Sequence, residues 1–254
     1  MQLRLTVRHS ARKATRVLVL SESVRQDIIE TYGISPERVT TIPIAAPAHF
    51  RPVTDEKELG RARHSYGIVG DYILSVGSIQ PRKNLTRLAS AYARLRCERP
   101  KGKLPKLVIV GKQAWLYDET LRAIEKSGIG DLTVLTGYVP ETDLPALYSG
   151  AICFVYPSYF EGFGLPPLEA MKCGTPVIAG NRTSMPEVVG EAGLLVDPFD
   201  ETAIASAIAC LIDNSDLRAE LRVKGLKREV QHEDRKSTRL NPSHSRASRM
   251  PSSA

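Results

Sequence analysis

The 254-residue sequence lacks the features that mark membrane, secreted and zinc-binding proteins. No apolar run approaches the roughly 18 residues that a membrane-spanning helix needs. The N-terminus has no long apolar segment that would act as a signal peptide. Only four cysteines occur, widely spaced and without a C-x-x-C pair, which argues against a zinc site and is typical of buried, reduced thiols. We therefore expect a cytoplasmic protein without a zinc site.

A second absence is that of a G-x-x-x-x-G-K-[ST] loop, which argues against a kinase or ATPase of that type. The formal net charge of +7 would ordinarily raise the question of a nucleic-acid partner. Residues 234–254, however, hold five basic residues and one acidic residue, a net of +4, which leaves +3 for the remainder of the chain. Because the excess is concentrated in this segment, we expect no nucleic-acid partner.

The segment 234–254 resembles the translation of a common short-read sequencing adapter. The bases GAT CGG AAG AGC ACA CGT CTG AAC encode residues 234–241, and TCT CGT ATG CCG TCT TCT GCT encode residues 248–254 in the same frame. Pro242 departs by a single base from the serine that the adapter encodes. The segment also has no apolar periodicity. We interpret it as an artefact, expect it to be disordered, and exclude it from the fold.

Residues 1–52 have the pattern of one short β-α-β unit. Apolar runs at 14–21 and 39–43 predict strands, and 21–32 has helical spacing, with Ser21 or Ser23 as the N-cap, that ends at Gly33. A single unit of this kind cannot bury its own faces, so we expect it to be the remnant of an N-terminal domain that is largely missing. Basic residues at its start permit peripheral contact with an anionic membrane surface: Arg4, Arg8, Arg12, Lys13 and Arg16. The charged segment 54–63 is interpreted as a linker.

Residues 53–233 show a more complete alternation of strands and helices. Apolar runs predict strands at 72–76, 106–110, 132–135, 152–156, 176–179 and 194–196. Amphipathic stretches predict helices at 84–98, 119–126, 141–148, 165–173, 185–189, 201–213 and 217–230. Strands that are apolar on both faces and alternate with helices indicate an α/β fold, a Rossmann-like parallel sheet with helices on both faces.

The segment 156–169 carries the most specific chemistry of the chain. A predicted strand runs into a loop with Glu161, Gly162 and Gly164, and two prolines then open a helix that contains Glu169. Free backbone N–H groups at such a helix start bind anions, and the helix dipole adds partial positive charge. Carboxylates accept hydrogen bonds from paired hydroxyls. The segment therefore predicts a ligand with both phosphate and hydroxyl groups, as in a nucleotide sugar.

Two cations follow the first strand of this predicted sheet. Arg82 and Lys83 lie within six residues of Gly77, and the carboxyl ends of parallel strands share one edge of a sheet. Because a cation at a helix start opposes the dipole unless it has an anion to bind, we expect these residues to contact a pyrophosphate. Trp115 and Tyr117 follow another strand end and can either line this pocket or pack in the core.

Taken together, these motifs resemble the retaining glycosyltransferases of family 4, which have the GT-B fold. The resemblance covers residues 10–233 and rests on V-G-S-I-Q-P-R-K-N-L, V-I-V-G, L-T-G-Y-V, the two glutamates with seven residues between them, and T-S-M-P-E-V-V-G-E-A-G-L-L-V-D-P, in family order. It implies that residues 53–233 are the C-terminal domain, which holds the nucleotide sugar.

The resemblance also implies roles for individual residues. Arg82 and Lys83 would contact the diphosphate, Glu161 the donor sugar's hydroxyls, and Glu169 the ribose. Further donor contacts would come from the strand ends and the glycine loop: Gly77, Tyr138, Val139, Gly162, Phe163, Gly164 and Leu165. The implied reaction transfers a hexose, mannose or glucose, to an acceptor hydroxyl with retention of anomeric configuration and without metal.

The family pattern is incomplete in this chain. Pro43-Ile-Ala-Ala-Pro47 stands where many members read Pro-Asn-Gly-Val-Asp, and most of the acceptor-binding domain is expected to be missing. We therefore expect a donor-binding half with little transfer activity. The implied acceptor is a glycan or lipid-linked saccharide of bacterial polysaccharide biosynthesis, at the inner face of the membrane. Two alternatives stay open: another GT-B enzyme such as a sugar-nucleotide epimerase, or a non-catalytic nucleotide-binding module.

Overall fold

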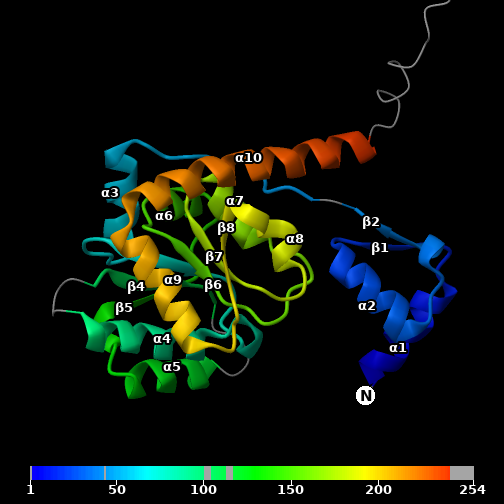
Figure 1. The fold of residues 1–254 in the computed structure, drawn as a ribbon, viewed down its shortest axis with the longest axis horizontal. Coiled ribbons are helices and arrows are strands. Elements are labelled where there is room, and N and C mark those ends of the chain that lie inside the picture. Colours follow the sequence, from blue (N-terminus) through cyan, green and yellow to red (C-terminus); the bar gives the residue numbers. More distant parts are fainter. Residues whose placement is uncertain (1, 43, 100–103, 113–116, 241–254) are drawn as a thin grey trace, which may run out of the picture.

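The computed structural model describes residues 2–42, 44–99, 104–112 and 117–240. A small N-terminal unit and a larger α/β domain follow one another along the chain (Figure 1). The N-terminal unit contains α1 (Gln2–Lys13), β1 (Val17–Val19), α2 (Glu22–Tyr32), the short 3-10 helix η1 (Pro36–Arg38) and β2 (Val39–Thr41). The parallel pair β1–β2 and α2 confirm the predicted β-α-β unit, and the α1 helix was not predicted.

The capping residues of α2 are those that the sequence indicates. Ser21 accepts a hydrogen bond from the Val24 N–H, and Gly33 adopts the left-handed conformation that ends many helices. The unit buries only a small apolar cluster, centred on Val19, Ile34 and Val39.

The larger domain is built on a six-stranded parallel sheet with the order β5-β4-β3-β6-β7-β8. Its strands are β3 (Tyr72–Val76), β4 (Lys106–Val110), β5 (Thr133–Gly137), β6 (Phe154–Tyr156), β7 (Val177–Gly180) and β8 (Gly193–Val196). All five residues of β3 are buried, which explains why its sequence is apolar on both faces. The predicted α/β class and parallel sheet are confirmed.

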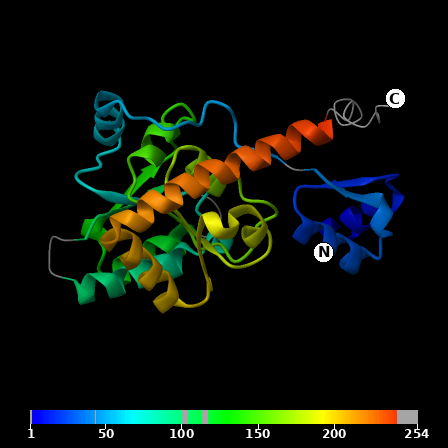
Figure 2. The same ribbon diagram turned by 45° about the horizontal axis from the view of Figure 1, so that its top comes forward.

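Helices cover both faces of this sheet (Figures 1 and 2). On one face lie α4 (Leu85–Glu98), α5 (Tyr117–Lys126) and α9 (Glu201–Asp213); on the other lie α3 (Glu56–Ser65), α6 (Leu144–Ser149), α7 (Leu165–Lys172) and α8 (Met185–Val189). The long α10 (Ser215–Leu240) crosses the latter face and packs on α7. The short 3-10 helices η2 (Pro81–Lys83), η3 (Gly130–Leu132) and η4 (Gly190–Ala192) lie in the connections.

Two predictions about helices are wrong. The segment interpreted as a linker contains α3, because Asp55 caps it, its residues favour helices, and Leu59 and Ala62 bury one narrow stripe. The C-terminal helix does not end at the predicted residue 230 but continues to Leu240, since extending a formed helix costs far less than starting one. Residues 234–240 are therefore helical rather than disordered, and 241–254 lie outside the described residues.

The strand order places one point of the sheet in a special position. The chain winds from β3 through β4 to β5 on one side, then returns to β6 on the other side of β3 and winds outward to β8. In open parallel sheets, ligands bind at the carboxyl ends of the strands where this reversal occurs. The loops that follow β3 and β6 are therefore the first place to look for a site.

Candidate functional site

The loop after β3 approaches the loop after β4 closely. A Cβ atom added to Gly111 would lie 2.0 Å from the Gly77 carbonyl oxygen, so a side chain there would displace backbone. Gly77 itself has φ +144°, a conformation that L side chains rarely adopt. These two glycines let the chain turn at the sheet edge and bring Arg82 and Lys83 toward the loop after β6.

Arg82, Lys83 and Glu161 form one charged cluster. The Glu161 carboxylate accepts hydrogen bonds from Arg82 Nη1 at 2.5 Å and from Lys83 Nζ at 2.7 Å, one on each oxygen. The Glu161 and Lys83 side chains are 8% and 9% exposed, whereas Arg82 is 39% exposed. The structure thus brings the three predicted catalytic residues together, with Arg82 at the solvent side.

Tyr156, at the end of β6, completes the cluster. Its hydroxyl donates to Glu161 at 3.0 Å and accepts a hydrogen bond from Lys83, whose Nζ also lies 4.4 Å from the centre of the tyrosine ring. Burial lowers the pKa of Lys83, and the nearby Glu161 carboxylate opposes that change. Burial, and then Glu161, raise the pKa of Tyr156, which keeps its hydroxyl protonated.

The pairing with Glu161 removes one reason to expect a bound anion at Arg82 and Lys83. The two cations were expected to need an external anion, because they precede a helix start. Glu161 supplies that anion within the protein, so the cations alone do not require a bound pyrophosphate. Both cations need a carboxylate partner, and Glu161 is that partner. A ligand phosphate near Arg82 would have to bind Arg82 together with Glu161 or take the place of Glu161.

Glu169 lies on α7 and has a different environment. The Tyr148 hydroxyl donates to it at 3.0 Å. Burial raises the pKa of Glu169 to about 7, and the negative charge of Glu141 adds to the rise. The carboxyl therefore changes its charge near neutral pH, and a hydroxyl-bearing ligand that donates to it would favour the charged form.

The glycine loop before α7 has the conformation that the sequence suggested. Gly164 has φ +122°, and a Cβ atom there would lie 2.2 Å from the Met185 methyl carbon, so this position requires glycine. Phe163 is buried against the ring of His232, whereas Gly162 is exposed. Leu165 begins α7. The backbone at Gly162, rather than the Phe163 side chain, is accessible to a ligand.

Of the two donor-binding residues predicted in the turn after β5, Tyr138 has an exposed side chain and Val139 does not. Tyr138 is 63% exposed, and Lys112 Nζ lies 4.5 Å from the centre of its ring. Val139 is buried in the core, so its side chain cannot contact a ligand, although its backbone can. Trp115 lies outside the described residues, so its place in the pocket or in the core stays a prediction.

Residues that the sequence did not single out complete the site. Tyr148 and Tyr156 are in a helix and a strand, where an aromatic residue indicates core packing, and only the structure shows that their hydroxyls reach carboxylates. Ser21, Thr183 and Ser184 contact the glycine loop from distant parts of the chain. No local signal in the sequence pairs these residues with the loop.

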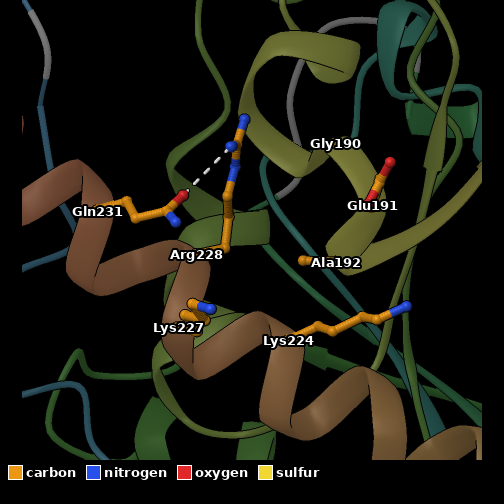
Figure 3. A pocket seen from close by; sticks show the side chains of 7 residues that line it. All are labelled: Gly190, Glu191, Ala192, Lys224, Lys227, Arg228 and Gln231. Atoms are coloured by element: carbon orange, nitrogen blue, oxygen red, sulfur yellow. Dashed lines mark hydrogen bonds between the residues drawn. The ribbon is translucent and has the colours of Figure 1, made fainter.

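A separate hollow of about 440 Å³ lies between η4 and α10 (Figure 3). Seven residues line it, three of them basic: Gly190, Glu191, Ala192, Lys224, Lys227, Arg228 and Gln231. Arg228 donates to the carbonyls of Glu187 and Val188 at the end of α8, and Lys224 pairs with Glu220 at 2.6 Å. Arg228 thus caps the end of α8, and Lys224 forms a surface ion pair. None of the predicted site residues lines the hollow.

Among the described residues, no group of three or more potential ligands lies close enough to hold a metal ion. Within the same residues, every helix is too short or too polar to cross a membrane.

Comparison with known proteins places this site in a family. The family model for glycosyl transferases group 1 matches residues 66–228. The chain belongs to this family. The match spans the whole sheet and the helices from α4 to α9, including both strand ends that carry Arg82, Lys83 and Glu161.

Curated relatives within this glycosyltransferase family include several mannosyltransferases. The chain is 36% identical over 221 residues to O-antigen chain mannosyltransferase B of Escherichia coli, covering 87% of this chain and 58% of the relative. It is 30% identical over 226 residues to the MMP alpha-(1->4)-mannosyltransferase of Mycolicibacterium hassiacum, covering 87% and 51%. The chain thus spans little more than half the length of these relatives.

Solved structures show the same fold. Sucrose-phosphate synthase from Thermosynechococcus elongatus matches with a TM-score of 0.79 and 25% identity, over 96% of this chain and 62% of that one. HepE of Anabaena, solved with UDP and glucose, matches with a TM-score of 0.80 and 21% identity, over 96% and 66%. These likenesses confirm the GT-B-type architecture that the sequence resemblance implied.

Proposed function

We propose that this chain is the donor-binding half of a retaining family 4 glycosyltransferase that transfers mannose from GDP-mannose to a saccharide hydroxyl. The observation that carries the proposal is the cluster of Arg82, Lys83 and Glu161 at the reversal point of the sheet. The mannosyltransferase names of several relatives support the sugar. Those names do not favour an epimerase or a non-catalytic module.

In this proposal the donor diphosphate lies against Arg82, Lys83 and the N–H groups of the 162–165 loop. Arg82 is the more exposed of the two cations and is therefore able to turn from Glu161 toward a phosphate. Lys83 stays buried between Tyr156 and Glu161, where a fixed charge acts strongly because little water screens it. Both cations stabilise the negative charge that grows on the leaving diphosphate. They take the role that a metal ion has in other transferases.

The reaction needs little acid–base chemistry from the protein. The bond from the anomeric carbon to the diphosphate oxygen breaks, and the acceptor oxygen bonds to that carbon on the same face. The acceptor proton passes to an oxygen of the departing nucleoside diphosphate. Glu161 binds hydroxyls of the donor sugar and Glu169 those of the ribose, so that positioning supplies most of the rate enhancement.

The acceptor in this proposal is a growing glycan or a lipid-linked saccharide at the cytoplasmic face of a membrane. Basic side chains of the first helix, among them Arg8, Arg12 and Lys13, are exposed or partly exposed and would lie toward anionic lipid.

Calorimetric titration of the 254-residue chain with GDP-mannose, UDP-glucose and UDP-GlcNAc tests the proposal. We expect saturable binding of GDP-mannose and weaker or no binding of the two UDP sugars. Arg82→Ala should weaken it by at least about tenfold, the loss of one charge-assisted hydrogen bond. Arg96→Ala is the matched control, because Arg96 is also 39% exposed and also pairs with a carboxylate, Asp131. Absence of binding by all three donors would contradict the donor-binding assignment.

A further inference from the structure

Three consecutive carbonyl groups of the glycine loop are held by two serine hydroxyls. Ser184 Oγ lies 3.0 Å from the Glu161 oxygen and 2.5 Å from the Phe163 oxygen, so its proton serves both acceptors. Ser21 Oγ donates to the Gly162 oxygen between them, at 2.8 Å. Both serines have 0% exposure. The loop that connects β6 to α7 is thus held by hydroxyls from two other segments.

These segments are far apart in the sequence. Ser21 belongs to the N-terminal unit, where it also caps α2, and lies 141 positions from Gly162. Ser184 directly precedes α8, in the turn after β7. The neighbouring unit makes a second bond to this region, because the Glu22 N–H donates to Glu187 on α8 at 2.8 Å.

The turn after β7 is itself conformationally costly. Thr183 has φ +52°, one of two non-glycine residues with positive φ in the described residues. A threonine in this region is strained, and such strain concentrates at functional sites. Here it directs the Thr183 hydroxyl to accept the Glu161 N–H at 3.1 Å while Ser184 holds the Glu161 carbonyl. The turn therefore holds both backbone polar groups of Glu161, its N–H through Thr183 and its carbonyl through Ser184.

A hydrogen bond that fixes the carbonyl group of one residue also fixes the direction of the N–H group of the next residue. In a trans peptide the C=O of one residue and the N–H of the next point in opposite directions. The N–H groups of Gly162 and Gly164 therefore point away from buried Ser184, and that of Phe163 points away from Ser21. In the described part of the chain, none of these three N–H groups donates a hydrogen bond, so the oxygens of a ligand that reaches this loop would supply their missing acceptors.

We propose that Ser21 and Ser184 are positioning residues that orient the N–H groups of residues 162–164 toward the phosphates of the nucleotide donor. This inference rests on the proposed function and adds two residues to it, one of them from outside the domain that holds the donor. It means that the N-terminal unit helps to shape the donor site through Ser21. A ligand's phosphates, and not its base, depend on these serines.

Titration of the chain with GDP and with guanosine, and with UDP and uridine alongside, tests the assignment. Ser21→Ala and Ser184→Ala should each weaken binding of the diphosphate about three- to tenfold, the range for one lost hydrogen bond, and leave nucleoside binding unchanged. Ser21→Thr keeps the hydroxyl and should bind the diphosphate within about twofold of the wild type. Ser90→Ala is the control, since the Ser90 hydroxyl donates to the Thr86 carbonyl within α4, in a different element from the loop.

The outcomes separate the inference from the function on which it rests. Unchanged diphosphate binding by both alanine variants overturns the inference alone. Equal weakening of diphosphate and nucleoside overturns it too, because that result indicates a general structural role. Failure of the wild type to bind any diphosphate overturns the inference together with the proposed function. Circular dichroism and urea unfolding of each variant show whether its fold is retained, and Ser184→Ala tests the loop without removing the α2 cap.

Discussion

Glu161→Ala should lower the free energy of unfolding of this chain by about 3–5 kcal/mol, the usual loss when one partner of a buried ion pair is removed. The reason is Lys83, whose side chain is 9% exposed and whose ammonium would keep, among the described residues, only the Tyr156 hydroxyl as a hydrogen-bond partner. Arg82 loses its partner as well, but it is 39% exposed and water can solvate it. Urea unfolding of the two proteins measures the difference.

A second variant keeps this prediction testable if Glu161→Ala does not fold. Glu161→Gln combined with Lys83→Met replaces both charges by neutral side chains of similar size, and we expect it to be more stable than Glu161→Ala. Glu98→Ala is the control, because its pair with Arg94 is more than half exposed on each side, and such pairs contribute at most about 1 kcal/mol. A cost for Glu161→Ala no larger than that of the control would contradict the buried cluster.

The second large effect is the pH dependence of Glu169. Because burial raises its pKa from 4.5 to about 7, folding favours the protonated carboxyl. The stabilising contribution of that protonated form is complete below the unfolded value near 4.5 and is lost as the pH rises through 7. At about 1.4 kcal/mol for each pKa unit, the ionised carboxyl costs about 3–4 kcal/mol above that range.

Glu169→Gln is neutral at every pH and removes this dependence. We expect the variant to match the wild type near pH 4 and to exceed it in free energy of unfolding by about 3–4 kcal/mol near pH 8, as measured by urea unfolding at both values. The Tyr148 hydroxyl can still donate to the amide oxygen. Glu125→Gln, an exposed position on α5, should show no such trend. A difference between Glu169→Gln and the wild type that stays constant from pH 4 to pH 8 would contradict a raised pKa.

The sequence predicted the sheet well because its central strands are buried on both faces. The strand from Tyr72 to Val76 is buried along its whole length, so its sequence is a nearly continuous apolar run. The strands β4 and β7 are almost entirely buried as well. The rule that carboxyl ends of parallel strands share an edge was enough to bring Arg82, Lys83 and Glu161 together. Segment 54–63 failed because α3 buries only Leu59 and Ala62, too few apolar residues to distinguish a helix from a charged linker.

The parts of the site that escaped prediction depend on tertiary contacts. Tyr156 and Tyr148 have rings in the core and hydroxyls on carboxylates, and no spacing in the sequence reveals the second property. Ser21 reads correctly as a helix cap, since it is one, but its hydroxyl also reaches a loop in another part of the chain. The adapter-like segment shows a related limit, because α10 runs into it up to Leu240 regardless of its origin.

Hydrogen–deuterium exchange of this chain with and without GDP-mannose tests most directly where the donor binds. Peptides that cover 77–84 and 161–173 should exchange more slowly when the donor is present, because it would contact the Arg82, Lys83 and Glu161 cluster and the start of α7. Peptides from the hollow between η4 and α10 should be unaffected. Protection confined to 190–192 and 224–231, with none at the two strand ends, would contradict the account.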